Sequence, residues 1–241
     1  MKLLYHFIGR DKIIDDKRYK ILLKILGDGF LEPNQTGENA YFFELKGIID
    51  PIHLGERLPI SFIDRDSCDD IAFKKHMKKY SNFAIGFDKQ FILDYGGNPV
   101  FYCFDSMRKS SNLRNYINVI IKHFDKLERE CIKDKLELNE IISDKLSFYQ
   151  ILQFLKPFNF EYNSKDKAVY DEREWRVLAT DDVNNKKVWD FKVRPAIEGI
   201  KCAIKEIIVP KKYCRLLKND IKKLFPDKAT PQVIIAENIV K

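Results

Sequence analysis

Short apolar stretches bounded by Gly, Pro, Asn or Asp recur along the chain, and this pattern predicts the strands of a β-sheet. The predicted strands are residues 3–8, 58–63, 83–87, 99–104, 169–178, 188–193, 203–209 and 232–237. In the first of them Leu4, His6 and Ile8 alternate with three further residues. Both faces are apolar apart from His6 and the Tyr5 hydroxyl, which is typical of a central, buried strand.

Apolar residues at helical spacing predict helices between these strands. The predicted helices are residues 18–26, 69–80, 89–95 and 210–225, together with two helices between residues 112 and 155. In the first of those two, the apolar residues that follow 3.6-residue spacing, with charges between them, are Leu113, Tyr116, Ile117, Ile120, Phe124 and Leu127. We therefore predict one α+β domain over residues 1–241, with a central twisted sheet, flanking helices and a helical hairpin inserted at about residues 110–157.

Composition is that of an ordinary globular protein. The chain has 241 residues, of which 45% are hydrophobic and 33% are charged. It contains no apolar run long enough to cross a membrane, and its N-terminus lacks the features of a signal peptide. Five Cys without a Cys-x-x-Cys pair indicate free thiols in a reducing compartment. We expect a cytoplasmic protein.

The charge balance is basic, with a net charge of +7 and an isoelectric point near 9.0. A basic surface favours nucleic acid or an acidic protein as a partner. A general Lys-rich composition explains the same balance without any partner. No helix-turn-helix, zinc-finger or RNA-binding signature accompanies the charge.

Several common catalytic motifs are absent. The chain lacks a P-loop, a Gly-x-Gly-x-x-Gly turn after a strand, His-Glu-x-x-His and Gly-x-Ser-x-Gly. The acidic cluster Asp64, Asp66, Asp69 and Asp70 has the ligand type that Mg²⁺ prefers, but it lacks the Glu-x-Lys pair of metal-dependent nucleases. We interpret these Asp residues as loop and helix-cap residues and predict no metal site.

Residues 169–178 carry the densest group of charges next to apolar residues. Alternation places Glu172, Glu174 and Arg176 on one face and Trp175 with Val177 on the other. Burying two carboxylates and a guanidinium is unfavourable unless they are paired. This stretch is therefore either a structural ion-pair ladder or the floor of an active site.

A second hypothesis combines this strand with the first one. A His on an early strand, an aromatic side chain and a late Glu suit NAD⁺ chemistry. The His would hydrogen-bond the ribose, the ring would stack on nicotinamide, and the Glu would stabilise an oxocarbenium-like transition state. A buried His6 satisfied by a structural partner, for which Glu174 is a candidate, is the alternative. The candidate catalytic residues are His6, Glu174 and Arg176, and the candidate NAD-binding residues are Tyr5, His6, Phe62 and Tyr80.

Five segments resemble the abortive-infection AbiGi family. They are YHFIGR at 5–10, RYKILLKILGDGFL at 18–31, the stretch 61–102, EREWR at 172–176 and IKEIIVP at 204–210. Ser61 replaces the usual Cys, and Asp66-Ser67 stands where the family tends to have Pro. The resemblance implies an antitoxin-like role in bacterial phage resistance, with a toxin encoded nearby as partner. The helical insert and the basic C-terminal helix would then be the contact surfaces.

The chain is also similar to DNA-targeting ADP-ribosyltransferases, which open with a Tyr-His strand and a helix and carry a late catalytic Glu. This similarity implies that His6 pairs with Glu174 and that Phe62 or Tyr80 lies at the nicotinamide. It implies an NAD-using enzyme that modifies nucleic acid or protein, as an alternative to a toxin-binding protein.

Overall fold

The computed structural model describes residues 2–9, 13–33, 59–65, 71–104, 112–134, 139–152, 154–158, 173–192, 203–225 and 230–240. The chain divides into two compact units. Unit 1 comprises Met1–Pro33, Ile60–Pro99 and Lys167–Lys241, and unit 2 comprises Asn34–Pro59 and Val100–Asp166. Helices occur together with a sheet of parallel and antiparallel strands, which confirms the α+β class. The assignment of residues 1–241 to a single domain stays a prediction.

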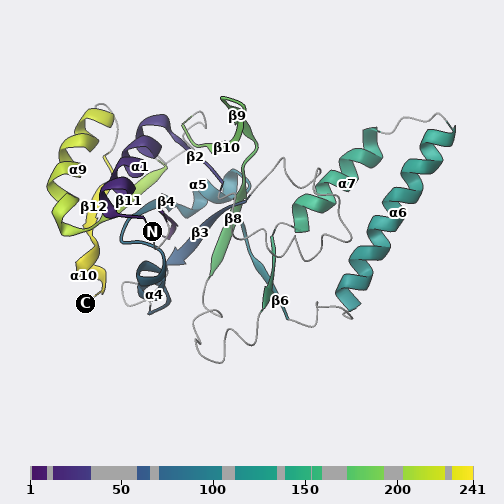
Figure 1. Cartoon of the computed structure of the whole chain (residues 1–241), viewed down its shortest axis with the longest axis horizontal. Helices are drawn as coiled ribbons and strands as arrows, with labels where there is room; N and C mark the ends of the chain where they lie inside the picture. Colours follow the sequence, from purple (N-terminus) through teal and green to yellow (C-terminus); the bar gives the residue numbers. More distant parts are fainter. Residues whose placement is uncertain are drawn as a thin grey trace. The chain divides into compact units, whose positions relative to one another are not determined.

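The main sheet of unit 1 has seven described strands in the order β12-β11-β4-β1-β3-β8-β5 (Figure 1). These strands are β1 (Leu3–Phe7), β3 (Pro59–Arg65), β4 (Ala84–Asp88), β5 (Asn98–Pro99), β8 (Glu174–Leu178), β11 (Ile204–Val209) and β12 (Gln232–Ile235). β1 lies in the middle and pairs antiparallel with β3 and β4, as its two apolar faces predict. β11 and β12 pair in parallel, which makes the sheet mixed.

The two faces of this sheet carry different hydrophobic clusters. The helices of unit 1 are α1 (Asp15–Asp28), α4 (Ile71–Lys79), α5 (Lys89–Asp94), α9 (Lys211–Leu224) and α10 (Ala236–Val240). Face A, defined by Leu4 and Phe62, packs against α1, α5 and α9. Face B, defined by Tyr5 and Ile63, packs against α4 and α10. Because side chains alternate along each strand, β1, β3, β4 and β11 contribute to both clusters.

Trp189 joins a smaller sheet to the face A cluster. This sheet has the order β2-β10-β9, with β2 (Phe30–Leu31), β9 (Asp181–Val183) and β10 (Lys186–Asp190). Trp189 on β10 is fully buried. Its ring centroid lies 5.8 Å from that of Phe62, 5.7 Å from that of Phe87 and 6.1 Å from that of Phe91. One indole therefore packs against rings from β3, β4 and α5.

Two boundaries predicted from the sequence are wrong. The strand predicted at 188–193 spans Lys186–Asp190 as β10, and a further strand, β9, ends at Val183 before a turn of Asn184 and Asn185, with φ values of 51° and 62°. Asn tolerates this left-handed conformation, which two-residue hairpins require. The last strand ends at Ile235 rather than at 237, and Ala236 begins α10. In α10 the Glu237 carboxylate accepts the Lys211 backbone N–H, a bond that caps the start of α9 (Lys211–Leu224).

Unit 2 contains the inserted helical hairpin that the sequence predicts. α6 (Asn112–Asp134) packs against α7 (Asn139–Leu152). The rings of Phe124 and Phe148 lie 6.0 Å apart, and Lys145 Nζ lies 2.8 Å from Asp125 Oδ1 and 2.9 Å from Glu128 Oε2. β6 (Phe101–Phe104) and β7 (Leu155–Phe158) pair in parallel at the ends of the hairpin. Across the part of the chain that is described, no helix has the length and apolar character needed to cross a bilayer.

Candidate functional site

The charged residues of β8 lie on face B and are buried. Glu174 and Arg176 keep only 3% and 2% of their surface exposed, whereas Val177 belongs to the face A cluster. The alternation predicted for this strand is therefore confirmed from Glu174 onward. Residues 169–172, and with them Glu172, lie outside the described residues.

Glu174 is the centre of a short hydrogen-bonded network. Arg176 Nε donates to Glu174 Oε1 at 2.8 Å, and Ser61 Oγ on the neighbouring strand β3 donates to the same oxygen at 2.8 Å. A carboxylate with an ionic and a neutral donor is stable in a low-dielectric interior. The geometry fits a structural ion pair. Sequence reasoning missed the role of Ser61, and the departure from the family's Cys at this position was the only signal for it.

Arg173, directly before β8, has a left-handed backbone conformation. Its φ of 40° lies in the left-handed region, which a non-glycine residue adopts only when its surroundings hold it there. The Arg173 carbonyl accepts the backbone N–H of Asp64 at 3.1 Å, so the strained residue is tied to β3. This backbone contact and the Ser61–Glu174 bond together fix the start of β8 against β3.

His6 and Glu174 do not form the direct pair that was expected. His6 is partly buried on face A, with its ring 5.8 Å from that of Phe62, whereas Glu174 lies on face B. His6 Nδ1 lies 3.0 Å from the Ser61 carbonyl oxygen, so the Nδ1–H tautomer donates this bond. His6 therefore contacts the Ser61 carbonyl, and Glu174 contacts the Ser61 hydroxyl. Strand β3 lies between their strands.

We expect His6 to make the protein less stable in mild acid. Burial lowers the pKa of His6 from its ordinary value of 6.5, because the imidazolium loses its hydration. Below pH 6.5 the unfolded chain therefore takes up this proton first. The free energy of unfolding should fall by up to about 1.4 kcal/mol per pH unit as the pH drops from 6.5 toward the folded pKa.

Urea denaturation at a series of pH values measures this effect. The His6→Asn variant keeps a donor near the position of Nδ1 and cannot titrate, so its stability should fall less steeply below pH 6.5. Above that pH the histidine contribution is fully present and both curves should run parallel. Identical slopes in the two proteins below pH 6.5 would contradict the assignment.

Tyr5 lies in a second polar group on face B. Its hydroxyl donates to Glu206 Oε2 at 2.6 Å, and the Arg65 guanidinium lies 5.8 Å from the Tyr5 ring and 4.9 Å from the Phe73 ring. Burial and the Glu206 carboxylate raise the pKa of Tyr5 well above its usual range. Gly86 faces Tyr5 on β4, where an added Cβ would approach the ring to 2.8 Å. Tyr5 is thus held as a neutral donor inside the core.

Phe62 and Tyr80 lie in different surroundings. Phe62 is fully buried in the face A cluster, with its ring next to those of Phe87 and Trp189. Tyr80 follows α4 and is partly buried, with its ring 6.2 Å from that of Phe7 on face B. The structure therefore divides the six predicted site residues. Tyr5, Tyr80, Glu174 and Arg176 lie on the face B side, and His6 and Phe62 lie on face A. Because the predicted site residues lie on two faces of the sheet, their positions do not add support to the hypothesis that they bind NAD. That hypothesis stays a prediction.

Asp64, the one member of the acidic cluster within the described residues, is engaged in an ion pair. Lys89 Nζ contacts Asp64 Oδ2 and lies 4.3 Å from the ring centroid of Trp175. Asp66, Asp69 and Asp70 lie outside the described residues. Within the described ranges, no three His, Cys, Asp or Glu side chains are grouped so that they could hold a metal ion.

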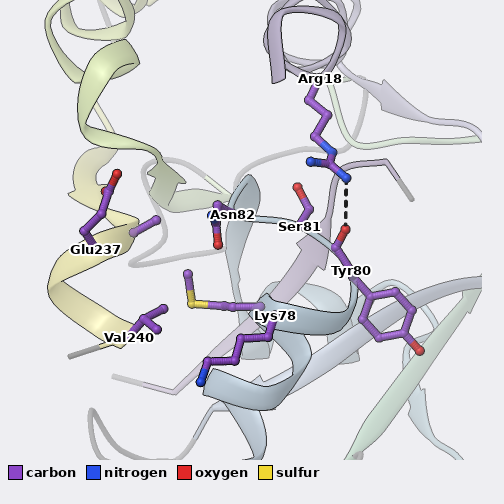
Figure 2. A pocket seen from close by; sticks show the side chains of 9 residues that line it. Arg18, Lys78, Tyr80, Ser81, Asn82, Glu237 and Val240 are labelled. Atoms are coloured by element: carbon purple, nitrogen blue, oxygen red, sulfur yellow. Dashed lines mark hydrogen bonds between the residues drawn. The ribbon is translucent and has the colours of Figure 1, made fainter. Parts of the chain in front are cut away.

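A cavity of about 460 Å³ opens beside α4 and α10 (Figure 2). It is lined by Arg18, Met77, Lys78, Tyr80, Ser81, Asn82, Ala236, Glu237 and Val240. The Arg18 guanidinium reaches it from α1 and donates to the Tyr80 carbonyl at 3.4 Å (Figure 2). Charged side chains of both signs together with apolar ones in the lining suit a small polar ligand. Three distant segments build this cavity, so no local motif could have predicted it.

α6 in unit 2 exposes an apolar row. Tyr116 and Val119 keep 65% and 64% of their surface exposed, and Ile120 keeps 39%. The buried contacts of the helix come instead from Ile117 and Ile121 on the adjacent side. The sequence predicted apolar residues at helical spacing here, and the structure divides them between a buried side and an exposed side of α6. The helix has two rows, because residues one position apart differ by about 100° around the axis.

The fold and these sites define an α+β protein that holds a buried Glu–Arg pair on a sheet strand and exposes an apolar row on one helix of an inserted hairpin. Residues 55–203 match the family model described as abortive phage resistance protein AbiGi, antitoxin. Because this match covers more than half of the chain, the protein belongs to the AbiGi family, and its role is in abortive phage resistance. Searches of curated proteins and of solved structures gave no significant match.

The matched range includes Ser61, Glu174 and Arg176, as well as the whole helical insert. It does not include YHFIGR, RYKILLKILGDGFL or IKEIIVP, on which part of the resemblance rested. It also leaves out His6. No similarity to ADP-ribosyltransferases is shown by these comparisons, so that resemblance stays a prediction.

Proposed function

We propose that this chain binds and neutralises a toxin protein encoded nearby, and that α6 supplies the contact surface. The observation that carries this proposal is the exposed row of Tyr116, Val119 and Ile120, which lies in the range matched to a family described as an antitoxin. Adjacent exposed apolar residues are unfavourable in water unless a partner covers them. An antitoxin has such a partner by definition of its role.

The residues around this row indicate which kind of surface the partner should have. Tyr116, Val119, Ile120 and His123 follow the spacing i, i+3, i+4, i+7, which is the spacing of anchors on a helix that enters a groove. Exposed Lys residues, Lys122 and Lys126 among them, lie on the neighbouring side of α6. We therefore expect an apolar groove on the toxin with carboxylates along its rim. Apolar anchors give affinity, and rim charges mainly raise the association rate.

Calorimetric titration of the purified protein with the product of the neighbouring gene tests this surface. Val119→Asp and Tyr116→Ser should each raise the Kd at least about tenfold, because central anchor residues dominate binding energy. Ile132 is the matched control, since it is also exposed (61%) but lies more than a third of a turn away from the row on the same helix. Ile132→Asp should leave the Kd unchanged.

Two results would reject the proposal. Absence of binding by the unsubstituted protein would remove the toxin partner. Equal loss of affinity in Val119→Asp and Ile132→Asp would remove the row as the contact surface. Circular dichroism of each variant shows whether α6 remains folded, so that a loss of binding can be assigned to the surface.

A further inference from the structure

α9 concentrates the positive charge of the protein. Its 14 residues, KKYCRLLKNDIKKL, contain six Lys or Arg and a single carboxylate, Asp220. The helix therefore carries a net charge of +5, against +7 for the whole chain. In the sequence the Lys and Arg residues are spread over the chain, but most of the net positive charge belongs to this one helix.

Four of these cations form a row on the outer side of the helix. Lys211, Arg215, Lys218 and Lys222 are spaced i, i+4, i+7, i+11, and all four are exposed. The row spans about 16 Å at a rise of 1.5 Å per residue. Tyr213, Leu217 and Ile221 occupy the opposite side and are buried against face A. Figure 1 shows α9 next to α1 at the edge of unit 1.

The carboxylates around α9 are engaged in contacts that do not involve the side chains of this row. Asp220 accepts the Tyr19 hydroxyl at 2.7 Å, Asp16 accepts the Tyr213 hydroxyl, and Asp15 lies 3.4 Å from Lys212 Nζ. These contacts lie in the seam where Tyr19 of α1 stacks on Tyr213 of α9. Glu237 bonds the Lys211 backbone N–H at the start of the helix. Within the described part of the chain, none of the four cations of the row forms an ion pair.

We propose that this row binds the phosphate backbone of nucleic acid without sequence preference. Four regularly spaced cations along about 16 Å present charge in the linear form that a phosphate backbone offers. This surface is separate from the toxin contact on α6, and it does not depend on that proposal. The row on α9 would bind nucleic acid through unit 1, whereas the proposed toxin contact on α6 belongs to unit 2.

Other partners fit the row less well. A membrane-bound amphipathic helix inserts its apolar side into lipid, but the apolar side of α9 is already packed in the core. Protein interfaces favour Tyr, Trp and Arg and are depleted in Lys, whereas three of the four residues in the row are Lys. Binding to phosphate needs only charge and reach, which exposed Lys residues provide.

Fluorescence anisotropy with a labelled duplex DNA of arbitrary sequence and a labelled single-stranded RNA tests this inference. If the four cations contact phosphates, the slope of log K against log salt should be about −3 to −4 on duplex DNA. The variant with Lys211→Gln, Arg215→Gln, Lys218→Gln and Lys222→Gln should lose most of that slope, and its affinity at low salt should fall more than about tenfold. A parallel arm with anionic lipid vesicles should show no binding.

α6 offers a matched control. Lys122, Lys126, Arg129 and Lys133 have the same spacing, and their change to Gln removes the same charge from the protein. Near this row Glu130 lies 3.6 Å from Lys126, and α6 also carries Asp125 and Glu128. This variant should keep nucleic acid binding. Equal loss in both variants would assign binding to net charge and overturn the site. Failure of the unsubstituted protein to bind DNA or RNA at low salt would also overturn it, as would binding of an acidic polypeptide or vesicles instead.

Discussion

Replacing Arg176 with Met should lower the free energy of unfolding by about 3–5 kcal/mol, because it leaves a buried carboxylate without its cation. Arg176 and Glu174 are almost fully buried, and Arg176 Nε donates to Glu174 Oε1 at 2.8 Å. In the variant, the Ser61 hydroxyl would still donate to the carboxylate. Met has a similar length and no charge, so the loss reports the broken pair more than a cavity. Chemical denaturation of both proteins measures the difference.

Two further variants separate burial from pairing. The double variant Glu174→Gln with Arg176→Met contains no unpaired charge and should recover a large part of the lost stability. Lys187→Met breaks an ion pair of the same length, Lys187 Nζ to Asp182 Oδ2 at 2.8 Å, but Asp182 is 67% exposed. That change should cost less than about 1 kcal/mol. Equal losses in Arg176→Met and Lys187→Met would contradict a structural role for the buried pair.

The Trp189→Ala variant should lose about 3–5 kcal/mol of the free energy of unfolding, since it removes the largest fully buried side chain. Its ring contacts come from β3, β4 and α5, so the cavity would lie where the smaller sheet meets face A. The packed rings around it cannot collapse into the space without leaving their own contacts.

Trp175 provides the comparison, because the chain has two Trp residues and Trp175 is only partly buried. Trp175→Ala should cost clearly less than Trp189→Ala, and Trp189→Phe should cost less than Trp189→Ala. Denaturation followed by circular dichroism gives the three values on one scale. A loss below about 1 kcal/mol for Trp189→Ala would show that the smaller sheet is not anchored through this residue.

Periodicity was enough to predict the strands and helices that bury apolar side chains. It placed Leu4 and Tyr5 on opposite faces of β1, and it placed Glu174 and Arg176 together on β8. It also predicted the inserted helical hairpin. These features depend on contacts that repeat within one element, and such contacts leave a pattern in the local sequence.

Relations between elements could not be predicted in the same way. Whether His6 and Glu174 share a face depends on the register of β1, β3 and β8, and a shift of one residue reverses the answer. The Glu237 carboxylate accepts the Lys211 N–H at the start of α9, and these two residues are distant in sequence. The exposure of Tyr116 depends on which row of α6 meets α7. In each case the deciding partner lies elsewhere in the chain.

We infer that the buried pair on β8 supports the fold, and we propose that the exposed row on α6 binds the toxin. Growth of cells that co-express the product of the neighbouring gene tests both parts in one measurement. We predict that the Glu174→Gln and Arg176→Met double variant, expressed in folded form, still restores growth, whereas Val119→Asp does not. Restored growth with Val119→Asp and continued toxicity with the folded double variant would contradict the account.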